Sequence, residues 1–207
     1  MIVILDLDYT LLDTAKFKDA LAVVFASCGV DRKSFDRAYK KTVTARPPEY
    51  DYDIDRHIGY LEEHLTCNVE KLKGRVNELL KSVDDHLYPG ARDFVERLRV
   101  GGARLVLLTL GNEFWQRIKM EHSTLSDMFD RIVTVGSGKE DVVGDIAKGH
   151  DKVVVINDNV DEIFRMLETN PTFLYIVKRG PRGVPGALDI PVCDSFEDIL
   201  EVMLLDS

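Results

Sequence analysis

The sequence is poor in cysteine, has no long apolar run and has no excess of positive charge, and each shortage excludes a class of protein. Its three cysteines, Cys28, Cys67 and Cys193, are odd in number and widely spaced. This argues against a disulfide framework and favours a reducing compartment. No apolar run approaches the roughly 20 residues that span a bilayer, and the first residues form no basic and apolar leader. We therefore expect a cytoplasmic protein without a membrane partner.

The charge balance also limits the partners. A formal net charge of −9 gives no support for binding nucleic acid, and a small anionic substrate would need its own pocket of donors, a metal, or both. The 207 residues, 45% of them hydrophobic, suit one α/β domain with an insertion or two small domains. There is no internal repeat and no low-complexity tract.

The chain opens with a stretch typical of a buried strand. Residues 2–5, Ile-Val-Ile-Leu, show no polar alternation, which is typical of a strand covered on both faces. Asp6 and Asp8 follow where that strand should end. A turn there would let both carboxylates converge on the crevice outside the carboxyl ends of the strands, where open α/β sheets bind ligands.

Residues 15–86 show helical spacing of apolar residues throughout, with a proline pair at 47–48 between the second and third predicted helices. The third of them is predicted from Ile54 to Leu65. The segment is too long for a simple crossover between neighbouring strands. We expect an α/β core formed by residues 1–14 and 87–207, with residues 15–86 inserted as an all-helical cap.

Two sets of polar residues in the predicted cap suggest a function, but simpler interpretations account for them. His57 and His64 are two helical turns apart, so a solvated helix face explains them better than joint metal ligation. Arg46, Tyr50 and Tyr52 are candidate substrate contacts, although a polar loop explains them better.

From residue 87 onward, predicted helices and strands alternate strictly. A loop rich in Gly, Pro and Arg covers 178–186, and Phe114 and Trp115 are expected to pack in the core. This alternation predicts a doubly wound, mostly parallel sheet. The strands are expected at 104–109, 132–135, 152–156 and 173–177. The helices are expected at 91–100, 113–122 and 139–148, then after the polar residues 157–161 up to about 169, and last at 195–205.

Chemically useful side chains follow several of these strands, and parallel strands deliver them to one edge of the sheet. Carboxylate oxygens suit Mg²⁺, while a hydroxyl and an ammonium group can hold the oxygens of a phosphate. The set is typical of magnesium-assisted phosphoryl transfer. Its members are Asp6, Asp8, Thr109, Lys139, Asp158 and Asp161.

The order and spacing of these residues resemble the haloacid dehalogenase superfamily of aspartate-nucleophile hydrolases. The resemblance rests on Asp-Leu-Asp-Tyr-Thr-Leu-Leu-Asp at 6–13, a strand ending at Thr109, Lys139, and Val-Val-Ile-Asn-Asp-Asn-Val-Asp at 154–161. It covers essentially the whole chain, with a helical cap directly after the first motif. The first motif is specific because it combines strand context, two aspartates and a threonine.

The resemblance implies a catalytic pair. Asp6 would attack phosphorus and become a transient aspartyl-phosphate. Asp8 would protonate the leaving alcohol and then activate the hydrolytic water. Dehalogenases of this superfamily lack an acid/base at that position because halide leaves without a proton, so Asp8 favours a small phosphorylated metabolite as substrate.

The resemblance also implies a binding set. Mg²⁺ would be held by Asp6, by the backbone carbonyl of Asp8 and by Asp158. Thr109 and Lys139 would hold the phosphate. Asp161 would assist the metal shell or orient the lysine. Two positions depart from the family pattern, since Asn157 stands where glycine or aspartate is frequent and Tyr9 where glycine is common.

Three other functions remain open at this stage. A phosphomutase would share the same chemistry and shield the aspartyl-phosphate from water. A catalytically silent member would bind a phosphorylated ligand only. A receiver-type signalling domain uses similar residues, but it is shorter, has no large helical insertion and carries its phosphorylated aspartate after an internal strand. Neither the particular substrate nor the oligomeric state follows from the sequence.

Overall fold

The first predicted strand, β1 (Ile2–Leu5), lies in the middle of the sheet in the computed structural model, which describes residues 1–44, 52–186 and 188–205. The described strands form one sheet in the order β3-β2-β1-β4-β5-β6, and each neighbouring pair is parallel. The strand order reverses at β1, so its carboxyl end, beside β2 and β4, is the topological switch point. The predicted fold class is confirmed. The other strands are β2 (Arg104–Leu110), β3 (Arg131–Val135), β4 (Val153–Asn157), β5 (Leu174–Lys178) and β6 (Val192–Cys193).

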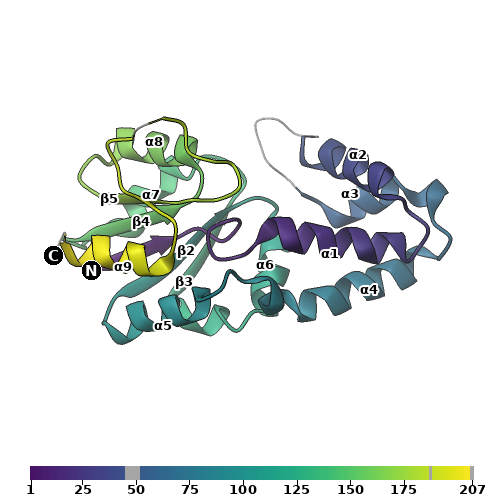
Figure 1. Cartoon of the computed structure of the whole chain (residues 1–207), viewed down its shortest axis with the longest axis horizontal. Coiled ribbons are helices and arrows are strands. Elements are labelled where there is room, and N and C mark those ends of the chain that lie inside the picture. Colours follow the sequence, from purple (N-terminus) through teal and green to yellow (C-terminus); the bar gives the residue numbers. More distant parts are fainter. Residues whose placement is uncertain (45–51, 187, 206–207) are drawn as a thin grey trace.

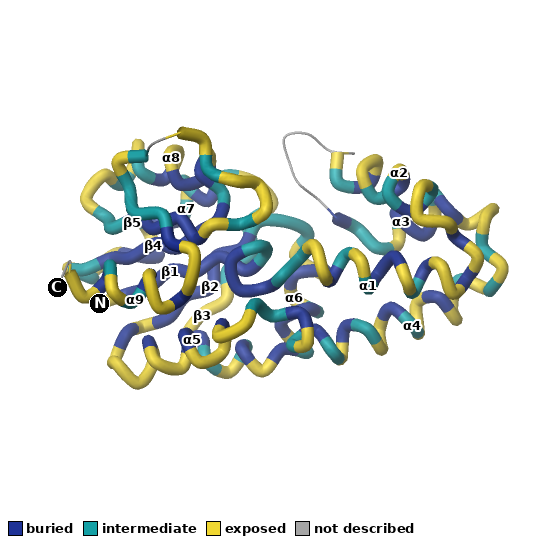
Figure 2. The backbone as a smooth tube through the Cα atoms, in the orientation of Figure 1, coloured by how far each residue is buried: buried dark blue, intermediate teal, exposed yellow. Residues whose placement is uncertain are grey.

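Helices cover both faces of this sheet (Figure 1). Alternate side chains of a strand point to opposite faces. Val3 and Leu5 therefore pack with α5 (Ala91–Val100) and α9 (Phe196–Leu205), whereas Ile2 and Ile4 pack with α7 (Glu140–Ala147) and α8 (Val160–Thr169). Figure 2 shows β1, β2 and β4 as the buried centre of the α/β core, whereas β3 at the edge is more exposed. Burial on both faces explains the uninterrupted apolar run of β1.

Between β1 and α5, the regular elements among the described residues are all helical. We call residues 14–44 and 52–86 the helical cap. Side-chain oxygens of Asp13, Asp31, Asp53 and Asn68 accept backbone N–H groups at the first turn of its four α-helices. The helix predicted from Ile54 to Leu65 ends earlier, at Gly59, and a 3-10 turn follows. The elements are α1 (Thr14–Ala26), α2 (Arg32–Val43), α3 (Ile54–Gly59), η1 (Glu62–His64), α4 (Val69–Lys81) and η2 (Val83–His86).

The chain enters and leaves the helical cap at one place. Leu12 and Leu87 form an antiparallel bridge. The backbone N–H of Asp13 donates to the carbonyl of His86 at 2.8 Å, and that of Tyr88 donates to Leu11 at 2.9 Å. The cap therefore connects to the core through two adjacent backbone segments.

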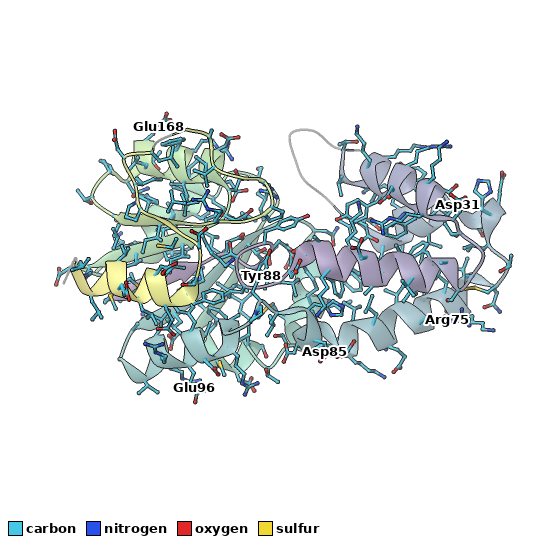
Figure 3. The ribbon with its side chains drawn as sticks, in the orientation of Figure 1. Asp31, Arg75, Asp85, Tyr88, Glu96 and Glu168 are labelled. Atoms are coloured by element: carbon cyan, nitrogen blue, oxygen red, sulfur yellow. A yellow bond between two sulfur atoms is a disulfide. The ribbon has the colours of Figure 1, made fainter. Side chains whose placement is uncertain are left out.

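The structure pairs Cys28 with Cys67 in a disulfide, contrary to the expectation from their spacing. The reason is the packing of α1 against α4, which run in opposite directions (Figure 1) and bring the end of α1 beside the start of α4. The N–H of Thr66 donates to the carbonyl of Cys28 at 2.8 Å. Figure 3 shows the neighbouring Asp31 and Arg75 at the end of the cap remote from the sheet. The cysteine argument for a reducing compartment therefore no longer applies.

His57 is also placed differently from the prediction. It is fully buried in the cap, whereas His64 is exposed, so the two do not share a solvated face. The ring lies against Phe25 and Phe35, with centroids 4.7 and 4.8 Å away. Its nitrogens bond to the Tyr52 hydroxyl at 2.9 Å and the Phe35 carbonyl at 3.2 Å. His57 thus belongs to the hydrophobic interior of the cap.

The remaining elements agree with the predicted alternation apart from β6, whose two residues are too few to show a period. They are α6 (Glu113–Glu121) and η3 (Ser126–Met128). No helix among the described residues is long and apolar enough to cross a membrane.

Candidate active site

Asp6 stands at the carboxyl end of β1, where its carboxylate is buried. Its Oδ1 lies 2.7 Å from the Nζ of Lys139, and its Oδ2 accepts a longer bond of 3.4 Å from the hydroxyl of Thr10. Burial raises the pKa of Asp6 above its usual range, although the charge of Lys139 opposes this. Burial therefore removes most of the water from around this carboxylate, the candidate nucleophile, and leaves Lys139 as its cationic partner.

Lys139 comes from the loop after β3, at the start of α7, and is 2% exposed. Its second partner is Glu162, whose Oε2 lies 2.8 Å from Nζ. Asp161, which was predicted to assist the metal shell or orient the lysine, is exposed. The acid that pairs with Lys139 is its neighbour Glu162, and the metal-shell role of Asp161 stays a prediction. Both acids lie in the first turn of α8, where successive side chains point about 100° apart, and Glu162 is the one that reaches Lys139.

Asp158 follows β4 and is 2% exposed. Its backbone N–H donates to the hydroxyl oxygen of Thr10 at 3.1 Å, so Thr10 links it to Asp6. Its Oδ2 is buried and has no hydrogen-bond partner. Burial and the nearby charge of Asp6 raise the pKa of Asp158 to about 7.

Asp8 is surrounded by donors from two helices. Lys119 Nζ lies 2.8 Å from both carboxylate oxygens, the Gln116 amide donates at 2.7 Å, and the Thr14 hydroxyl donates at 2.7 Å. Burial alone would raise the pKa of Asp8, but the charge of Lys119 and these hydrogen bonds lower it. The carboxylate is therefore held ionised in this arrangement.

Gln116 and Lys119 were not among the predicted site residues. They lie three positions apart on α6 and are each 3% exposed, so both point from one helix face into the site. The Gln116 amide also donates to the hydroxyl oxygen of Thr109 at 2.8 Å, which ties the end of β2 to Asp8. A polar pair at this spacing on the helix that follows Thr109 was the available signal.

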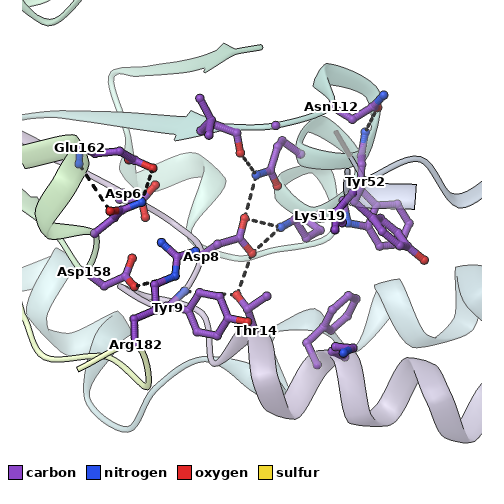
Figure 4. A pocket seen from close by; sticks show the side chains of 18 of the residues that line it. Asp6, Asp8, Tyr9, Thr14, Tyr52, Asn112, Lys119, Asp158, Glu162 and Arg182 are labelled. Carbon is purple, nitrogen blue, oxygen red and sulfur yellow. Dashed lines mark hydrogen bonds and ion pairs between the residues drawn. The ribbon is translucent and has the colours of Figure 1, made fainter. Parts of the chain in front are cut away.

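The charged and amide side chains of this set line one cavity of about 580 Å³ between the α/β core and the helical cap. Thr109, predicted to hold the phosphate, is buried behind Gln116 and is not among the lining residues. Figure 4 shows Asp6, Asp8 and Asp158 side by side there, with Glu162 behind Asp6 and Lys119 reaching Asp8. Among its described lining residues, five carboxylates face four cations, leaving a net negative charge. The acids are Asp6, Asp8, Asp158, Asp161 and Glu162, and the bases are Lys18, Lys119, Lys139 and Arg182.

The side of the cavity formed by the helical cap is aromatic. Tyr39 and Tyr52 stack with centroids 4.9 Å apart, and Tyr52 lies 5.0 Å from Trp115 of α6. Trp115 is buried as predicted, whereas Phe114 is 52% exposed and does not pack in the core. Tyr52 thus lines the cavity. Arg46 and Tyr50 lie outside the described residues.

The two unusual motif positions have distinct surroundings. Asn157 is buried, and its amide donates to Glu162 at 2.9 Å, which helps to hold the acid that holds Lys139. Tyr9 has φ of +63°, a left-handed conformation that favours glycine, which explains why glycine suits this position. Its N–H donates to the Leu12 carbonyl at 2.8 Å, so the turn imposes this conformation.

The described residues contain no cluster of three or more His, Cys, Asp or Glu side chains placed to hold a metal. Two carboxylates, Asp6 and Asp158, are close enough to interact electrostatically, and one buried oxygen of Asp158 has no hydrogen bond. Hard oxygen donors with room for water are what Mg²⁺ accepts. The residues therefore fit Mg²⁺ better than a metal that prefers nitrogen or sulfur ligands.

Comparison with solved structures shows the same fold in several proteins. A haloacid dehalogenase-like hydrolase from Burkholderia xenovorans is 18% identical, with 99% of this chain and 96% of that chain covered and a TM-score of 0.73. The HAD-hydrolase YfnB from Bacillus subtilis, bound to magnesium, is 16% identical, with 97% of each chain covered and a TM-score of 0.66. A protein described as a beta-phosphoglucomutase from Thermotoga maritima is 21% identical, with 99% of each chain covered and a TM-score of 0.62.

Sequence comparison identifies the family. Among curated proteins no sequence matches significantly. The family model for haloacid dehalogenase-like hydrolases matches residues 3–142, which include the first strand, the helical cap, Thr109 and Lys139. The chain therefore belongs to the haloacid dehalogenase-like hydrolases.

Proposed function

We propose that the protein is a Mg²⁺-dependent phosphatase that hydrolyses a small phosphorylated metabolite through an aspartyl-phosphate on Asp6. One observation carries the proposal: Asp6, Asp8 and Asp158 line the same cavity, and Oδ2 of Asp158 has no hydrogen bond. The proposed nucleophile, acid/base and metal ligand thus line one cavity, where a single substrate could reach all three. Because the residues of the helical cap form the opposite wall, the cap would close over the substrate and exclude bulk water.

The residues would act in two steps. Asp8 first takes up a proton from solvent, against the lowering of its pKa by Lys119, so that it can act as an acid. A carboxylate oxygen of Asp6 then attacks phosphorus, the bond to the leaving oxygen breaks, and Asp8 gives that oxygen its proton. Asp8 then takes a proton from water, which attacks phosphorus and releases phosphate and free Asp6. Lys139, 2.7 Å from Asp6, would stabilise the phosphoryl oxygens in both steps. The donors around Asp8 lower its pKa, so it is ionised and ready to act as the base of the second step. The first step needs the protonated form and therefore slows as the pH rises above that pKa.

The charge of the cavity supports a requirement for a divalent cation. A phosphate ester carries about two negative charges, and the described lining residues already have more carboxylates than cations. When bound, Mg²⁺ would supply the positive charge that lets the two anions meet. Asp6, Asp158 and the backbone carbonyl of Asp8 would hold it, and the relative YfnB was crystallised with magnesium.

The test is a phosphate-release screen over phosphorylated metabolites, with Mg²⁺ and with EDTA. We expect Asp6→Asn to abolish turnover and Asp8→Asn to lower kcat by about 10²- to 10⁴-fold, the usual contribution of general acid–base catalysis. Asp161→Asn is the matched control, because this exposed acid should leave kcat within about twofold. Full activity of Asp6→Asn, or equal activity in EDTA, would overturn the proposal.

Two other reactions are distinguished by further assays beside this screen, one for isomeric phosphate esters and one for halide release. A phosphomutase would convert one phosphate ester to its isomer without free phosphate, and the fold shared with the Thermotoga protein keeps this as the alternative. A dehalogenase would release halide from 2-haloacids. Asp8 argues against the dehalogenase, because halide needs no proton. We further propose that the enzyme acts in the cytoplasm, which fractionation with an antibody to the chain would test.

A further inference from the structure

Arg182 occupies a rigid corner beside the active site. It belongs to the turn Gly180-Pro181-Arg182-Gly183, in which the N–H of Gly183 donates to the carbonyl of Gly180 at 3.2 Å. Proline restricts the backbone at the second position, and Gly183 has φ of +71°. A Cβ at Gly180 would lie 3.2 Å from the side chain of Asp158, so the glycine lets the turn approach the site. The backbone of Arg182 is therefore fixed close to Asp158.

The side chain of Arg182 lacks a close anionic partner. The three other cations that line the cavity have carboxylate oxygens within 2.9 Å: Asp8 for Lys119, Asp6 and Glu162 for Lys139, and Asp36 for Lys18. The nearest carboxylate contact of Arg182 is 3.8 Å, from Nε to Asp158 Oδ2, which is too long for a hydrogen bond. This one long ion pair engages Nε, which leaves the Nη groups of Arg182 without a carboxylate contact among the described residues and able to bind an anion.

Tyr9 holds this guanidinium in place. The central carbon of the guanidinium lies 5.1 Å from the centroid of the Tyr9 ring, within the range of a cation–π contact. Figure 4 shows Arg182 between Tyr9 and Asp158. Tyr9 keeps its left-handed backbone although a residue with Cβ is disfavoured there. Strain of this kind is concentrated at functional sites, and here it brings an aromatic ring under Arg182.

Arg182 lies further out than the reacting groups. The side chains of Lys139 and Asp6 are 2% and 8% exposed, whereas that of Arg182 is 47% exposed and still lines the cavity. The transferred phosphate must lie deep, against Asp6 and Lys139. Arg182 instead faces the part of a substrate that projects toward the mouth.

We propose that Arg182, supported by Tyr9, binds a second anionic group of the substrate, so that the preferred substrates are phosphate monoesters that also carry a carboxylate or another phosphate. This rests on the proposed phosphatase function and names its substrate class. A guanidinium is suited to either group, because its planar donors match both carboxylate and phosphate.

The experiment measures binding apart from turnover. Calorimetry on the Asp6→Asn protein with Mg²⁺ would compare two matched pairs: 3-phosphoglycerate with glycerol 3-phosphate, and fructose 1,6-bisphosphate with fructose 6-phosphate. We expect the compound with the extra anion in at least one pair to bind about tenfold more tightly. Adding Arg182→Gln should remove that preference. Adding Arg179→Gln should retain it, since Arg179 pairs with Asp194 at 2.6 Å and does not line the cavity.

Each result decides the inference. Equal binding within both pairs, or a preference that survives Arg182→Gln, would overturn it. A loss of preference in Arg179→Gln as well would also overturn it, because a general effect of loop charge would then explain the result. Phosphate release by the wild-type enzyme is measured separately, so absent turnover with an intact preference would reject the phosphatase and retain the anion site.

Discussion

Acidification should destabilise the helical cap, because His57 is buried there in its neutral form. The Phe35 carbonyl can only accept, so Nε2 of His57 carries the hydrogen and Nδ1 accepts from the Tyr52 hydroxyl. A proton on Nδ1 would remove that acceptor and place a charge among aromatic rings. Burial lowers the pKa of His57 to about 4; the Phe35 hydrogen bond and the charge of Asp36 oppose this shift, and Lys18 adds to it.

The size of the effect follows from the two pKa values. Unfolded, His57 takes up its proton near its ordinary pKa of 6.5, whereas the folded protein takes it up near 4. The neutral ring therefore stabilises the fold fully above about pH 6.5, and this contribution is lost as the pH falls toward 4. At 1.36 kcal/mol per pKa unit the whole effect is about 3 kcal/mol, of which about 2 kcal/mol is lost between pH 7.5 and pH 5.

The assay is urea unfolding at pH 7.5 and pH 5, followed by the fluorescence of Trp115. This is the single tryptophan of the chain, and its ring lies 5.0 Å from that of Tyr52 in the helical cap. His57→Gln should be less stable than wild type at pH 7.5 but should lose about 2 kcal/mol less on acidification. Comparing the two losses cancels the carboxylates that titrate in both proteins. The exposed His64→Gln variant is the control and should behave as wild type.

One outcome would refute the reasoning about His57. If wild type and His57→Gln lose the same free energy of unfolding between pH 7.5 and pH 5, His57 titrates near its ordinary pKa in the folded protein. The conclusion that the buried ring of His57 is neutral would then be wrong, and so would the assignment of its hydrogen to Nε2.

Three further predictions concern the site and the cap. Glu162→Gln should lower the free energy of unfolding by about 2 kcal/mol by removing a charge-assisted bond to the site lysine, whereas Asp161→Asn should change it by less than about 0.5 kcal/mol; chemical denaturation separates them. Reducing the Cys28–Cys67 disulfide, whose partners are 39 residues apart, should cost up to about 4 kcal/mol, and a double serine variant should not respond to reductant. Lys119→Met should raise the pKa of the acid/base aspartate and move the alkaline limb of the kcat/KM profile to higher pH; an unmoved limb would contradict the lowered pKa.

The sequence was most informative where a pattern of residues occurs in few structural settings. An apolar run with two aspartates at its end predicts β1 and the site edge, because a doubly buried strand and paired carboxylates are each rare in other settings. The structure brings Asp6, Lys139 and Asp158 together there, as predicted. Asn157, which breaks the family pattern, became intelligible only through its bond to Glu162.

What the sequence could not show depends on rotation and on contacts distant in the chain. Glu162 and Asp161 are adjacent acids, and only the phase of α8 decides which one faces Lys139. The burial of His57 depends on rings from α1 and α2, and a spacing of seven residues carries no information about them. The pairing of Cys28 with Cys67 likewise required the antiparallel packing of α1 and α4, which local periodicity does not predict.

The bridge between Leu12 and Leu87 allows the cap side of the cavity to change independently of the catalytic carboxylates. Because the two ends of the helical cap meet at neighbouring backbone positions, a different insert of any length could join the same two positions without moving a strand of the sheet. The catalytic carboxylates would keep their geometry through such an exchange. Exchange of the helical cap could therefore change which substrates fit the cavity while the reaction catalysed by the core stays the same.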